Sequence, residues 1–256
     1  YVNWYIKRYK YKNKANLKKF LKTKQYILEA GCGLARDSKL FADLNKKAKI
    51  YACDQSINSI RIARRNLKDY KNINIFRQDI TKKFSKKIKY DFISCDQVLH
   101  HTPKPGKTLK NLYSCLNKNG YLNFFVCRKK NVFRDFIDDE IMNYFKDKSP
   151  NELWDFSVKV TKFAKNLHDL KITNLSFGNK KYNNLQLFFH YNSFRAWYDP
   201  KINFDLSVSS NYDWFSNNPR YSLTEIKKIL YSNLRNFKLI SIYEDDASIS
   251  ISIRKL

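Results

Sequence analysis

The feature that most constrains the fold of this chain is a regular alternation of short apolar runs and amphipathic segments between residues 25 and 127. The short runs have the length and composition of buried β-strands, and they occur at residues 25–30, 49–53, 74–76, 90–95 and 120–126. Apolar side chains at helical spacing predict helices at residues 36–46, at residues 57–67 after a Ser56 N-cap, and after a turn at residues 103–106. Strands that alternate with helices predict right-handed crossovers and a largely parallel sheet, with ligands at the carboxyl ends of the strands.

The end of the chain follows a different pattern. Residues 222–236 predict a helix, and residues 238–243 and 248–253 predict two strands joined by a short acidic turn. A connection that short permits only an antiparallel pair. The predicted fold class is therefore α/β, a Rossmann-like doubly wound sheet of five parallel strands with a C-terminal antiparallel hairpin.

A long insertion, residues 128–221, separates the fifth strand from the last helix. It contains Trp154, Trp197 and Trp214 and has helical patterns of its own near residues 135–146 and 151–167. Because a connection of this length inside a compact domain is usually functional, we expect a helical, aromatic cap over the carboxyl edge of the sheet. The chain has no internal repeat and no low-complexity linker. We therefore predict a single domain over residues 1–256, with a core of residues 21–127 and 222–256.

The net charge is high but evenly spread. Lys and Arg number 50 against 23 Asp and Glu, which gives a formal charge of +27. Lys, Asn and Ile are abundant everywhere, and this uniform bias is typical of genome composition rather than of selection for a polyanion. A positive field raises encounter rates with any anion, so nucleic-acid binding stays an alternative. It is not favoured, because no basic stripe with interleaved aromatics stands out.

Cysteine spacing and hydropathy argue against three other kinds of protein. The five cysteines form no Cys-x-x-Cys pair and are odd in number, so we expect neither a metal site nor a disulfide framework. No apolar run approaches the roughly 18–20 residues that cross a bilayer, and residues 1–20 lack a signal-like apolar centre. We expect a cytoplasmic protein with no transmembrane segment.

A glycine turn stands where the first strand meets the first helix. Gly31 and Gly33 let the backbone bend tightly and approach a ligand, and the helix start offers free amide groups. A dinucleotide is disfavoured, because Arg36 occupies the position of the third glycine in that fingerprint. The acid before the turn, Glu29, would repel phosphate but suits an ammonium group. Asp54, at the end of the second strand, can accept both hydroxyls of a ribose.

Further side chains complete a nucleoside-like site. Residues 78–80 follow the third strand and could meet an adenine amino group and one ring face. With these positions, the sequence resembles the class I S-adenosylmethionine-dependent methyltransferases. Residues 29–33 match the first motif of that family, and residues 95–101 match the fourth motif. The third glycine of the family is Ala35 here, which is a mild departure.

The resemblance covers residues 25–127 and 222–256 and implies S-adenosyl-L-methionine as cofactor. It implies these cofactor-binding residues: Glu29, Gly31, Cys32, Gly33, Asp54, Gln55, Asp79, Ile80, Asp96 and Gln97. Simpler roles stay open for some of them, because Asp is common as a helix cap and in turns. Asp54 could cap the helix after Ser56, Asp79 could be a turn residue, and Cys32 could be tolerated for its size.

Two histidines follow the fourth strand. His100 and His101 are candidate general bases, and a His pair there often shapes the pocket in the resembling family. Methyl transfer from a sulfonium needs mainly in-line placement of a nucleophile and desolvation. A base is needed only for acidic or protonated nucleophiles, so the catalytic role stays open for both.

The sequence lacks the motifs of two classes of nucleic-acid methyltransferase, which narrows the choice of methyl acceptor. Asp96 is followed by Gln97, not by the Pro-Pro-aromatic run of amino-group methylases acting on nucleic acids, and no cysteine follows a proline or threonine. We therefore expect methyl transfer to a hydroxyl or amine of a small or lipid/glycan-linked metabolite. The alternatives are an RNA or protein methyltransferase that uses the basic surface, and a non-catalytic cofactor-binding partner subunit.

Three stretches of the insertion, residues 133–139, 185–191 and 212–215, are similar to segments of bacterial methyltransferases associated with surface-glycan or secondary-metabolite pathways. The similarity implies these substrate-binding residues: Arg134, His190, Tyr191, Arg195 and Trp214. In the alternative interpretation the aromatic side chains pack the insertion, and Arg134 pairs with Asp138.

Overall fold

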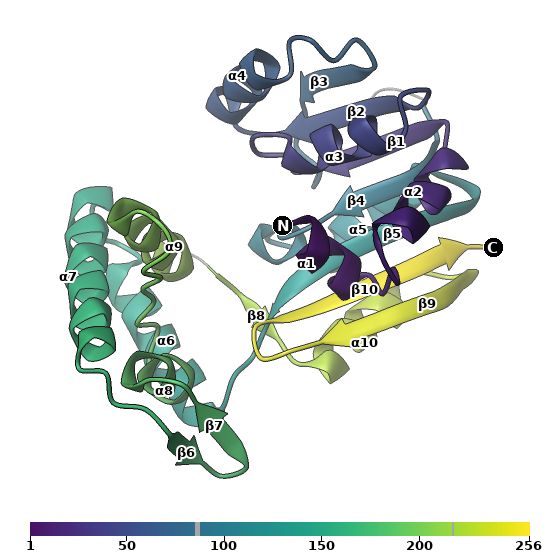
Figure 1. Ribbon diagram of the computed structural model, residues 1–256. Coiled ribbons are helices and arrows are strands. Elements are labelled where there is room, and N and C mark those ends of the chain that lie inside the picture. The colour runs from purple at the N-terminus through teal and green to yellow at the C-terminus, as the bar shows by residue number, and fades with distance from the viewer. Residues whose placement is uncertain (85–87, 217) are drawn as a thin grey trace. The chain divides into compact units, whose positions relative to one another are not determined.

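The computed structural model describes residues 1–84, 88–216 and 218–256. Its main feature is a mixed sheet with the strand order β3-β2-β1-β4-β5-β10-β9 (Figure 1). The strands are β1 (Tyr26–Ala30), β2 (Lys49–Asp54), β3 (Ile73–Arg77), β4 (Tyr90–Cys95), β5 (Leu116–Arg128), β9 (Phe237–Glu244) and β10 (Ser248–Lys255). Strands β1 to β5 pair in parallel, whereas β10 is antiparallel to both β5 and β9. The predicted α/β fold with its antiparallel C-terminal hairpin is confirmed.

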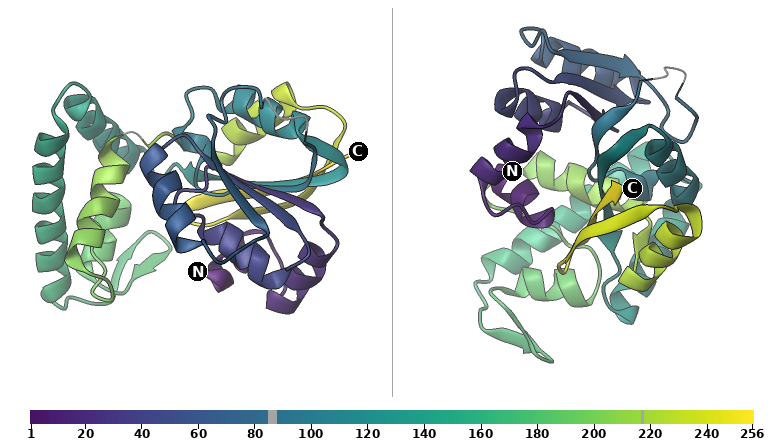
Figure 2. Two further views of the ribbon diagram at one scale, coloured as in Figure 1. Left: turned by 90° about the horizontal axis from the view of Figure 1, so that it is seen from above. Right: turned by 90° about the vertical axis from the view of Figure 1, so that its right-hand side faces the viewer.

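Helices cover both faces of this sheet (Figure 2). They are α1 (Val2–Arg8), α2 (Lys14–Lys22), α3 (Arg36–Leu44), α4 (Ile57–Asn66), α5 (Pro105–Ser114) and α10 (Leu223–Asn233). Successive side chains of a strand point to opposite faces, so neighbouring residues of β1 reach different helices. Ile27 packs with Phe41 of α3 and Leu17 of α2, whereas Leu28 belongs to the cluster that contains side chains of α5 and α10.

Local signals explain where these helices begin. Ser56 accepts the backbone N–H of Ser59 and caps α4, as the sequence predicts. Ser222 and Glu225 form a reciprocal capping box at the start of α10. Such caps satisfy amide groups that have no partner within the helix.

The chain divides into two compact units. Unit 1 contains Tyr1–Arg128 and Arg220–Leu256, and unit 2 contains Lys129–Pro219. Unit 1 therefore includes the first twenty residues, which the predicted core left out. Helices α1 and α2 pack Tyr5, Leu17 and Leu21 into its interior. A two-residue strand that the sequence analysis did not predict, β8 (Arg220–Tyr221), pairs with the end of β5.

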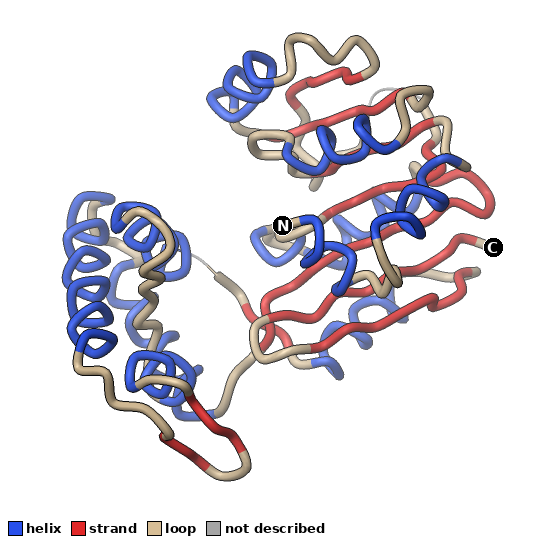
Figure 3. The backbone as a smooth tube through the Cα atoms, viewed as in Figure 1, coloured by secondary structure: helices blue, strands red, loops and turns tan. Residues whose placement is uncertain are grey.

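Unit 2 is mainly helical (Figure 3). Its elements are α6 (Val132–Phe145), α7 (Pro150–Asp169), β6 (Leu175–Phe177), β7 (Lys180–Tyr182), α8 (Leu185–Asn192) and α9 (Phe204–Ser216). The limits of unit 2 lie within two residues of those predicted for the insertion. Helix α7 covers the second predicted helical pattern, and α6 covers the first except for its last residue. Its role as a cap over the site stays a prediction.

The five cysteines are buried and unbridged. In the part of the chain that the structure describes, no three His, Cys, Asp or Glu side chains are grouped so that they could hold a metal ion. Among the same residues, no helix combines the length and the apolar character needed to cross a membrane.

Candidate active site

A pocket of about 300 Å³ lies at the carboxyl edge of the parallel strands. The segments that follow β1, β2, β3 and β4 form its wall, as expected for an α/β sheet. Its lining residues are Gly31, Asp54, Gln55, Gln78, Asp79, Ile80, Thr81, Val98, His101, Thr102 and Pro103. The structure thus brings together six of the predicted site residues, namely Gly31, Asp54, Gln55, Asp79, Ile80 and His101.

The glycine turn has the conformation that its sequence predicts. Gly31 and Gly33 have positive φ angles of 76° and 51°. A Cβ atom on Gly31 would lie 2.3 Å from Cγ1 of Val98, so only glycine fits there. A Cβ atom on Gly33 would meet nothing within 4 Å, so the backbone at Gly33 borders open space. Ala35 is also left-handed, with φ of 59°, which explains why the resembling family has a glycine at that position.

Asp54 connects the glycine turn with the start of α4. Its Oδ2 accepts the backbone N–H of Gly33 at 2.9 Å, and its Oδ1 accepts the backbone N–H of Ser56 at 2.8 Å. The side chain therefore supports the turn before α4, whereas the cap that the alternative interpretation assigns to Asp54 is provided by Ser56. Each carboxylate oxygen keeps accepting capacity, and the half-buried Asp54 also lines the pocket.

Asp79 likewise has a structural role in a turn and also lines the pocket. Its Oδ1 accepts the backbone N–H of Thr81 at 2.9 Å and the Thr81 hydroxyl at 2.7 Å, which makes it a turn residue. These bonds from Thr81 lower the pKa of Asp79. Its neighbour Ile80 is buried and presents an apolar surface to the same pocket.

Glu29 does not line the pocket. Its Oε2 accepts the backbone N–H of Ser38 at 2.7 Å and also the Ser38 hydroxyl, so the carboxylate is bound to the first turn of α3. Burial, and then the charge of Asp37, raise the pKa of Glu29 well above its usual range. Its predicted contact with an ammonium group stays a prediction.

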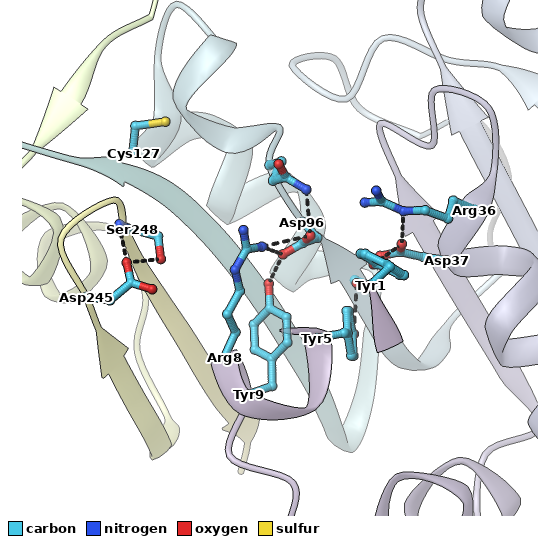
Figure 4. A network of polar contacts seen from close by, with 12 residues as sticks. Tyr1, Tyr5, Arg8, Tyr9, Arg36, Asp37, Asp96, Cys127, Asp245 and Ser248 are labelled. Atoms are coloured by element: carbon cyan, nitrogen blue, oxygen red, sulfur yellow. Dashed lines mark hydrogen bonds and ion pairs between the residues drawn. The ribbon is translucent and has the colours of Figure 1, made fainter. Parts of the chain in front are cut away.

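The Asp96 carboxylate accepts hydrogen bonds from residues of α1 and its C-cap (Figure 4). Its Oδ1 accepts hydrogen bonds from Arg8 Nη1 at 3.0 Å and from the Tyr9 hydroxyl at 2.7 Å. Its Oδ2 accepts from the same Arg8 nitrogen at 3.1 Å and from Gln97 Nε2 at 3.2 Å. The Asp96 side chain is only 3% exposed, and neither Asp96 nor Gln97 lines the pocket.

Two further tyrosines attach the N-terminal segment to the same edge of the sheet. The Tyr5 hydroxyl lies 3.1 Å from the Ser94 hydroxyl in β4, and the Tyr1 hydroxyl donates to Asp37 at the start of α3 (Figure 4). Burial, and then the charge of Asp96, raise the pKa of Asp37 to about 6. The sequence analysis missed this cluster. Tyr1, Tyr5 and Tyr9 recur every four residues and share one helical face, but this spacing does not show which part of the sheet that face contacts.

The two histidines differ in exposure and in their position relative to the pocket. His100 is 2% exposed, and its Nε2 lies 3.5 Å from Sγ of Cys127. Burial, and then the charge of His101, lower the pKa of His100 to about 3, so its ring is neutral and a weak proton acceptor at neutral pH. His101 is exposed and lines the pocket.

Comparisons with known proteins agree with this geometry. Residues 28–122, which include the glycine turn and the strands around the pocket, match a family model described as a methyltransferase domain. The matched part of the chain is therefore similar to a methyltransferase domain, as the motifs indicate. A search of curated proteins gave no match.

Solved methyltransferases share the fold at low sequence identity. PKMT2 of Rickettsia typhi in complex with AdoHcy has a TM-score of 0.60 at 16% identity, over 91% of this chain and 49% of that chain. A putative S-adenosylmethionine-dependent methyltransferase of Listeria monocytogenes has a TM-score of 0.53 at 13% identity, over 95% and 98%. A SAM-dependent methyltransferase of Aquifex aeolicus has a TM-score of 0.52 at 12% identity, over 98% and 92%.

The residues around the pocket fit S-adenosyl-L-methionine, the cofactor that the sequence resemblance implies. The open space beside Gly33 allows a ligand to approach the backbone closely, and Asp54 offers a carboxylate to hydroxyl groups. Ile80 supplies an apolar surface for a flat ring. Cys32 and Gly33 lie in the turn itself and shape it without lining the pocket.

The substrate-binding candidates lie in unit 2, and most of them gather around Asp138. Arg134 Nε donates to Asp138 Oδ2 at 2.7 Å, and both side chains have no exposed surface. Trp214 Nε1 donates to the same oxygen at 2.9 Å, and the backbone N–H of Arg195 donates to Asp138 Oδ1 at 2.9 Å. The alternative interpretation, in which Arg134 pairs with Asp138, is confirmed. Substrate contact through Arg134 or Trp214 stays a prediction.

His190 and Tyr191 are neighbours of this cluster. His190 is 4% exposed, and burial, followed by the charges of Arg134 and Arg195, lowers its pKa well below the usual value. Its ring packs edge-on against that of Tyr191 at 4.9 Å between centroids. Tyr191 and Arg195 are half-buried, so they remain the more accessible candidates of the five.

Proposed function

We propose that the pocket at the carboxyl ends of β1, β2 and β3 holds the adenosine part of S-adenosyl-L-methionine. We further propose that the enzyme transfers the methyl group to a hydroxyl or amine of a small or lipid/glycan-linked metabolite. The observation that carries the first part is the position of Asp54, whose carboxylate is bound to the backbone of Gly33 and lines the pocket. A carboxylate in this position accepts hydrogen bonds from both hydroxyls of a ribose.

The proposal gives each wall of the pocket a role. Asp54 and Gln55 bind the ribose, while Asp79 and Ile80 bind the adenine. Gly31 and Gly33 let the ligand approach the backbone. The other predicted contacts, Glu29, Cys32, Asp96 and Gln97, support the site from outside the pocket wall.

The chemistry of the chain itself is mainly positioning. The cofactor supplies an electrophilic methyl group on a sulfonium when it is bound. The protein then needs to align the acceptor for in-line displacement and to exclude water from the reacting atoms. If the acceptor has to lose a proton, His101 is the candidate base, because it lies in the pocket wall. His100 is not, because it is buried and has a pKa of about 3.

One observation bears on the alternative of RNA or protein methylation. A surface groove of about 780 Å³ is lined by six lysines, namely Lys18, Lys22, Lys24, Lys46, Lys47 and Lys49. It includes Tyr26 and Lys49, the first residues of β1 and β2, and therefore lies at the amino edge of the sheet. A polyanion held there would not reach the carboxyl edge directly, so the groove does not favour a nucleic-acid acceptor.

The function is tested with the full chain and radiolabelled cofactor. Calorimetry with S-adenosylhomocysteine should show saturable binding, and label should enter the small-molecule or lipid-linked fraction of a cell extract. Label in an RNase- or protease-sensitive fraction would instead support the alternative acceptors. Binding without any transfer would support the non-catalytic subunit. Absence of binding would refute the cofactor site.

A further inference from the structure

Helix α1 carries a buried guanidinium group at the active edge of the sheet. The Arg8 side chain is 1% exposed, which is unusual for an arginine outside a binding site or a complete ion pair. Its Nη1 donates to both oxygens of Asp96, at 3.0 and 3.1 Å. Burial lowers the pKa of Arg8, and the charge of Asp96 opposes that shift. Asp96 therefore holds Arg8 in place through one nitrogen only.

The other edge of the guanidinium group is not used by the protein. Nε and Nη2 are buried, and neither has a hydrogen-bond partner among residues 1–84, 88–216 and 218–256. The rings of Trp4 and Phe125 lie over the group, the latter with its centroid 4.2 Å from the guanidinium carbon. Ring faces cannot accept the in-plane N–H groups of that edge as a carboxylate does. Buried charged donors without an acceptor are costly and rarely persist without a ligand or a water.

The position of this edge points to a ligand of the reaction. Asp96 directly follows β4, and Phe125 lies in β5, so Arg8 is bound where those two strands approach the carboxyl edge. The pocket wall extends from the end of β3 through Gly31 to Val98, two residues beyond Asp96. Arg8 therefore lies beside the adenosine pocket, on the side of β5.

The chemistry of the edge selects the ligand group. The N–H bonds of Nε and Nη2 are parallel and match the two oxygens of a carboxylate in a bidentate pair. The charge of Asp96 already neutralises much of the Arg8 charge. A second carboxylate, Asp37, is near enough for the charge of Asp96 to raise its pKa. A doubly charged phosphate would therefore be repelled more strongly than a carboxylate, which carries a single charge.

We propose that the Nε–Nη2 edge of Arg8 binds a carboxylate of a ligand at the active edge, so that α1 is part of the ligand-binding site. This inference rests on the proposed function. The carboxylate belongs either to the amino-acid end of the cofactor or to the acceptor, and the two sources give different results in the experiments below. Trp4, which is 40% exposed, is then the outer cover of the bound group.

The first experiment tests the cofactor as the source. Arg8→Lys keeps a positive charge for Asp96 but removes the parallel pair of donors. Lys7→Gln is the matched control, because Lys7 is the exposed neighbour of Arg8 in the same helix. Calorimetry compares S-adenosylhomocysteine with its decarboxylated analogue. We expect the wild type and Lys7→Gln to prefer the carboxylated ligand by about 10-fold or more. Arg8→Lys should lose that preference while it binds the decarboxylated ligand as well as the wild type does.

The second experiment tests the acceptor as the source, with benzoate as a model carboxylate and benzamide as the neutral control. The Nε–H signal of Arg8 is assigned in arginine-labelled protein by its loss in Arg8→Lys. Saturable movement of this signal by benzoate and not by benzamide, with unchanged preference for S-adenosylhomocysteine in Arg8→Lys, would identify the acceptor side. The titration is run with and without S-adenosylhomocysteine, so its result does not depend on cofactor binding.

The outcomes separate this inference from the proposed function. If Arg8→Lys leaves the preference for the carboxylated cofactor intact and benzoate does not move the Nε–H signal, the carboxylate site is refuted. Binding of S-adenosylhomocysteine in that case would leave the cofactor pocket standing. If the wild type binds neither adenosyl ligand, the proposed function fails, and the benzoate titration alone decides on Arg8.

Discussion

Replacement of Asp54 by alanine tests the central contact of the proposed cofactor site. The side chain makes two kinds of contribution that the substitution removes together. It accepts the backbone N–H groups of Gly33 and Ser56 at 2.9 and 2.8 Å, and its remaining lone pairs are available to a ribose. Affinity and stability should therefore both fall in Asp54→Ala, and the experiment has to separate them.

The two effects are measured separately. The two backbone hydrogen bonds also have the charged Asp54 carboxylate as acceptor, so before exposure is taken into account they contribute about 1.5–3 kcal/mol each to folding. A hydrogen bond to a charged acceptor contributes about 1.5–3 kcal/mol, and the ribose would make two of them. Because Asp54 is half-buried and part of this energy is lost to solvent, we expect a loss of about 2–4 kcal/mol in binding. This corresponds to a Kd for S-adenosylhomocysteine that is higher by roughly 30- to 1000-fold.

Ser56→Ala is the matched control for the structural part. Ser56 caps α4 through its side chain, which accepts the backbone N–H of Ser59 at 3.2 Å. Loss of this cap should cost about 1 kcal/mol of stability. It leaves the backbone N–H of residue 56 available to Asp54, so the ribose contact is retained. Its Kd should stay within about three-fold of the wild type.

The assay is calorimetry with S-adenosylhomocysteine, with thermal unfolding of each free variant measured in parallel. The proposed role predicts a large loss of affinity in Asp54→Ala and almost none in Ser56→Ala. An equal and small loss in the two variants would show that Asp54 only shapes the chain around α4. An unchanged affinity in Asp54→Ala would refute the ribose contact outright.

Two further predictions concern buried groups outside the pocket. Because the folded pKa of His100 is about 3 and the ordinary value is 6.5, its neutral form stabilises the fold above pH 6.5, and this contribution is lost as the pH falls toward 3. The wild type should therefore lose about 2 kcal/mol of unfolding free energy between pH 7 and pH 5 that His100→Phe does not lose, as measured by urea unfolding. A stability difference between the two proteins that does not change with pH would contradict the assignment. Trp214→Phe removes the donor to the buried carboxylate of Asp138 and should cost about 1–3 kcal/mol in unfolding without a change in S-adenosylhomocysteine affinity, so an unchanged stability would be inconsistent with the bond.

The sheet was predictable because its signals are local. Four of the five parallel strands are short apolar runs, and the predicted limits of β4 agree with the observed ones. The fifth, β5, extends beyond the predicted residues 120–126 at both ends. The helix starts were marked by Ser56 and by the pair of Ser222 and Glu225, whose partners lie three residues away. Gly31 was also readable, since a strand-to-helix turn with positive φ requires a residue without a Cβ atom.

Helix α1 was not predictable in the same way, because its partners are distant in the chain. Tyr5 meets Ser94, and Arg8 and Tyr9 meet Asp96, at separations of 87 to 89 residues. The helix has seven residues and no side-chain cap, so it lacks the length and the start signal on which the sequence analysis relied. Its place at the carboxyl edge depends on burial and on pairing with β4, and neither can be read from periodicity.

Four acidic residues belong to the motifs, namely Glu29, Asp54, Asp79 and Asp96. A motif predicts where in the fold such a side chain lies, but it does not predict which group the side chain binds. Glu29 lies one residue before the end of β1, and Asp54 ends β2. Asp79 and Asp96 follow β3 and β4, so the fold brings all four to one edge of the sheet. Asp54 and Asp79 accept hydrogen bonds from backbone N–H groups and a hydroxyl at the same edge of the sheet, and both side chains line the pocket. Glu29 and Asp96 instead bind α3 and α1 and are withdrawn from it.

In unit 2, too, some candidate side chains are bound to a buried partner and others are more accessible. This difference shows where to look for the acceptor site. Arg134 and Trp214 are cationic and aromatic, as a substrate site often is, yet both bind the buried Asp138. A side chain that already has a buried partner must break that bond to contact a substrate, at a cost of about 1–3 kcal/mol or more. Tyr191 and Arg195 are half-buried, and the Arg195 side chain donates to the neutral Ser210 hydroxyl, which is a weaker acceptor than the Asp138 carboxylate. The first substitutions aimed at substrate turnover should therefore be made at Tyr191 and Arg195.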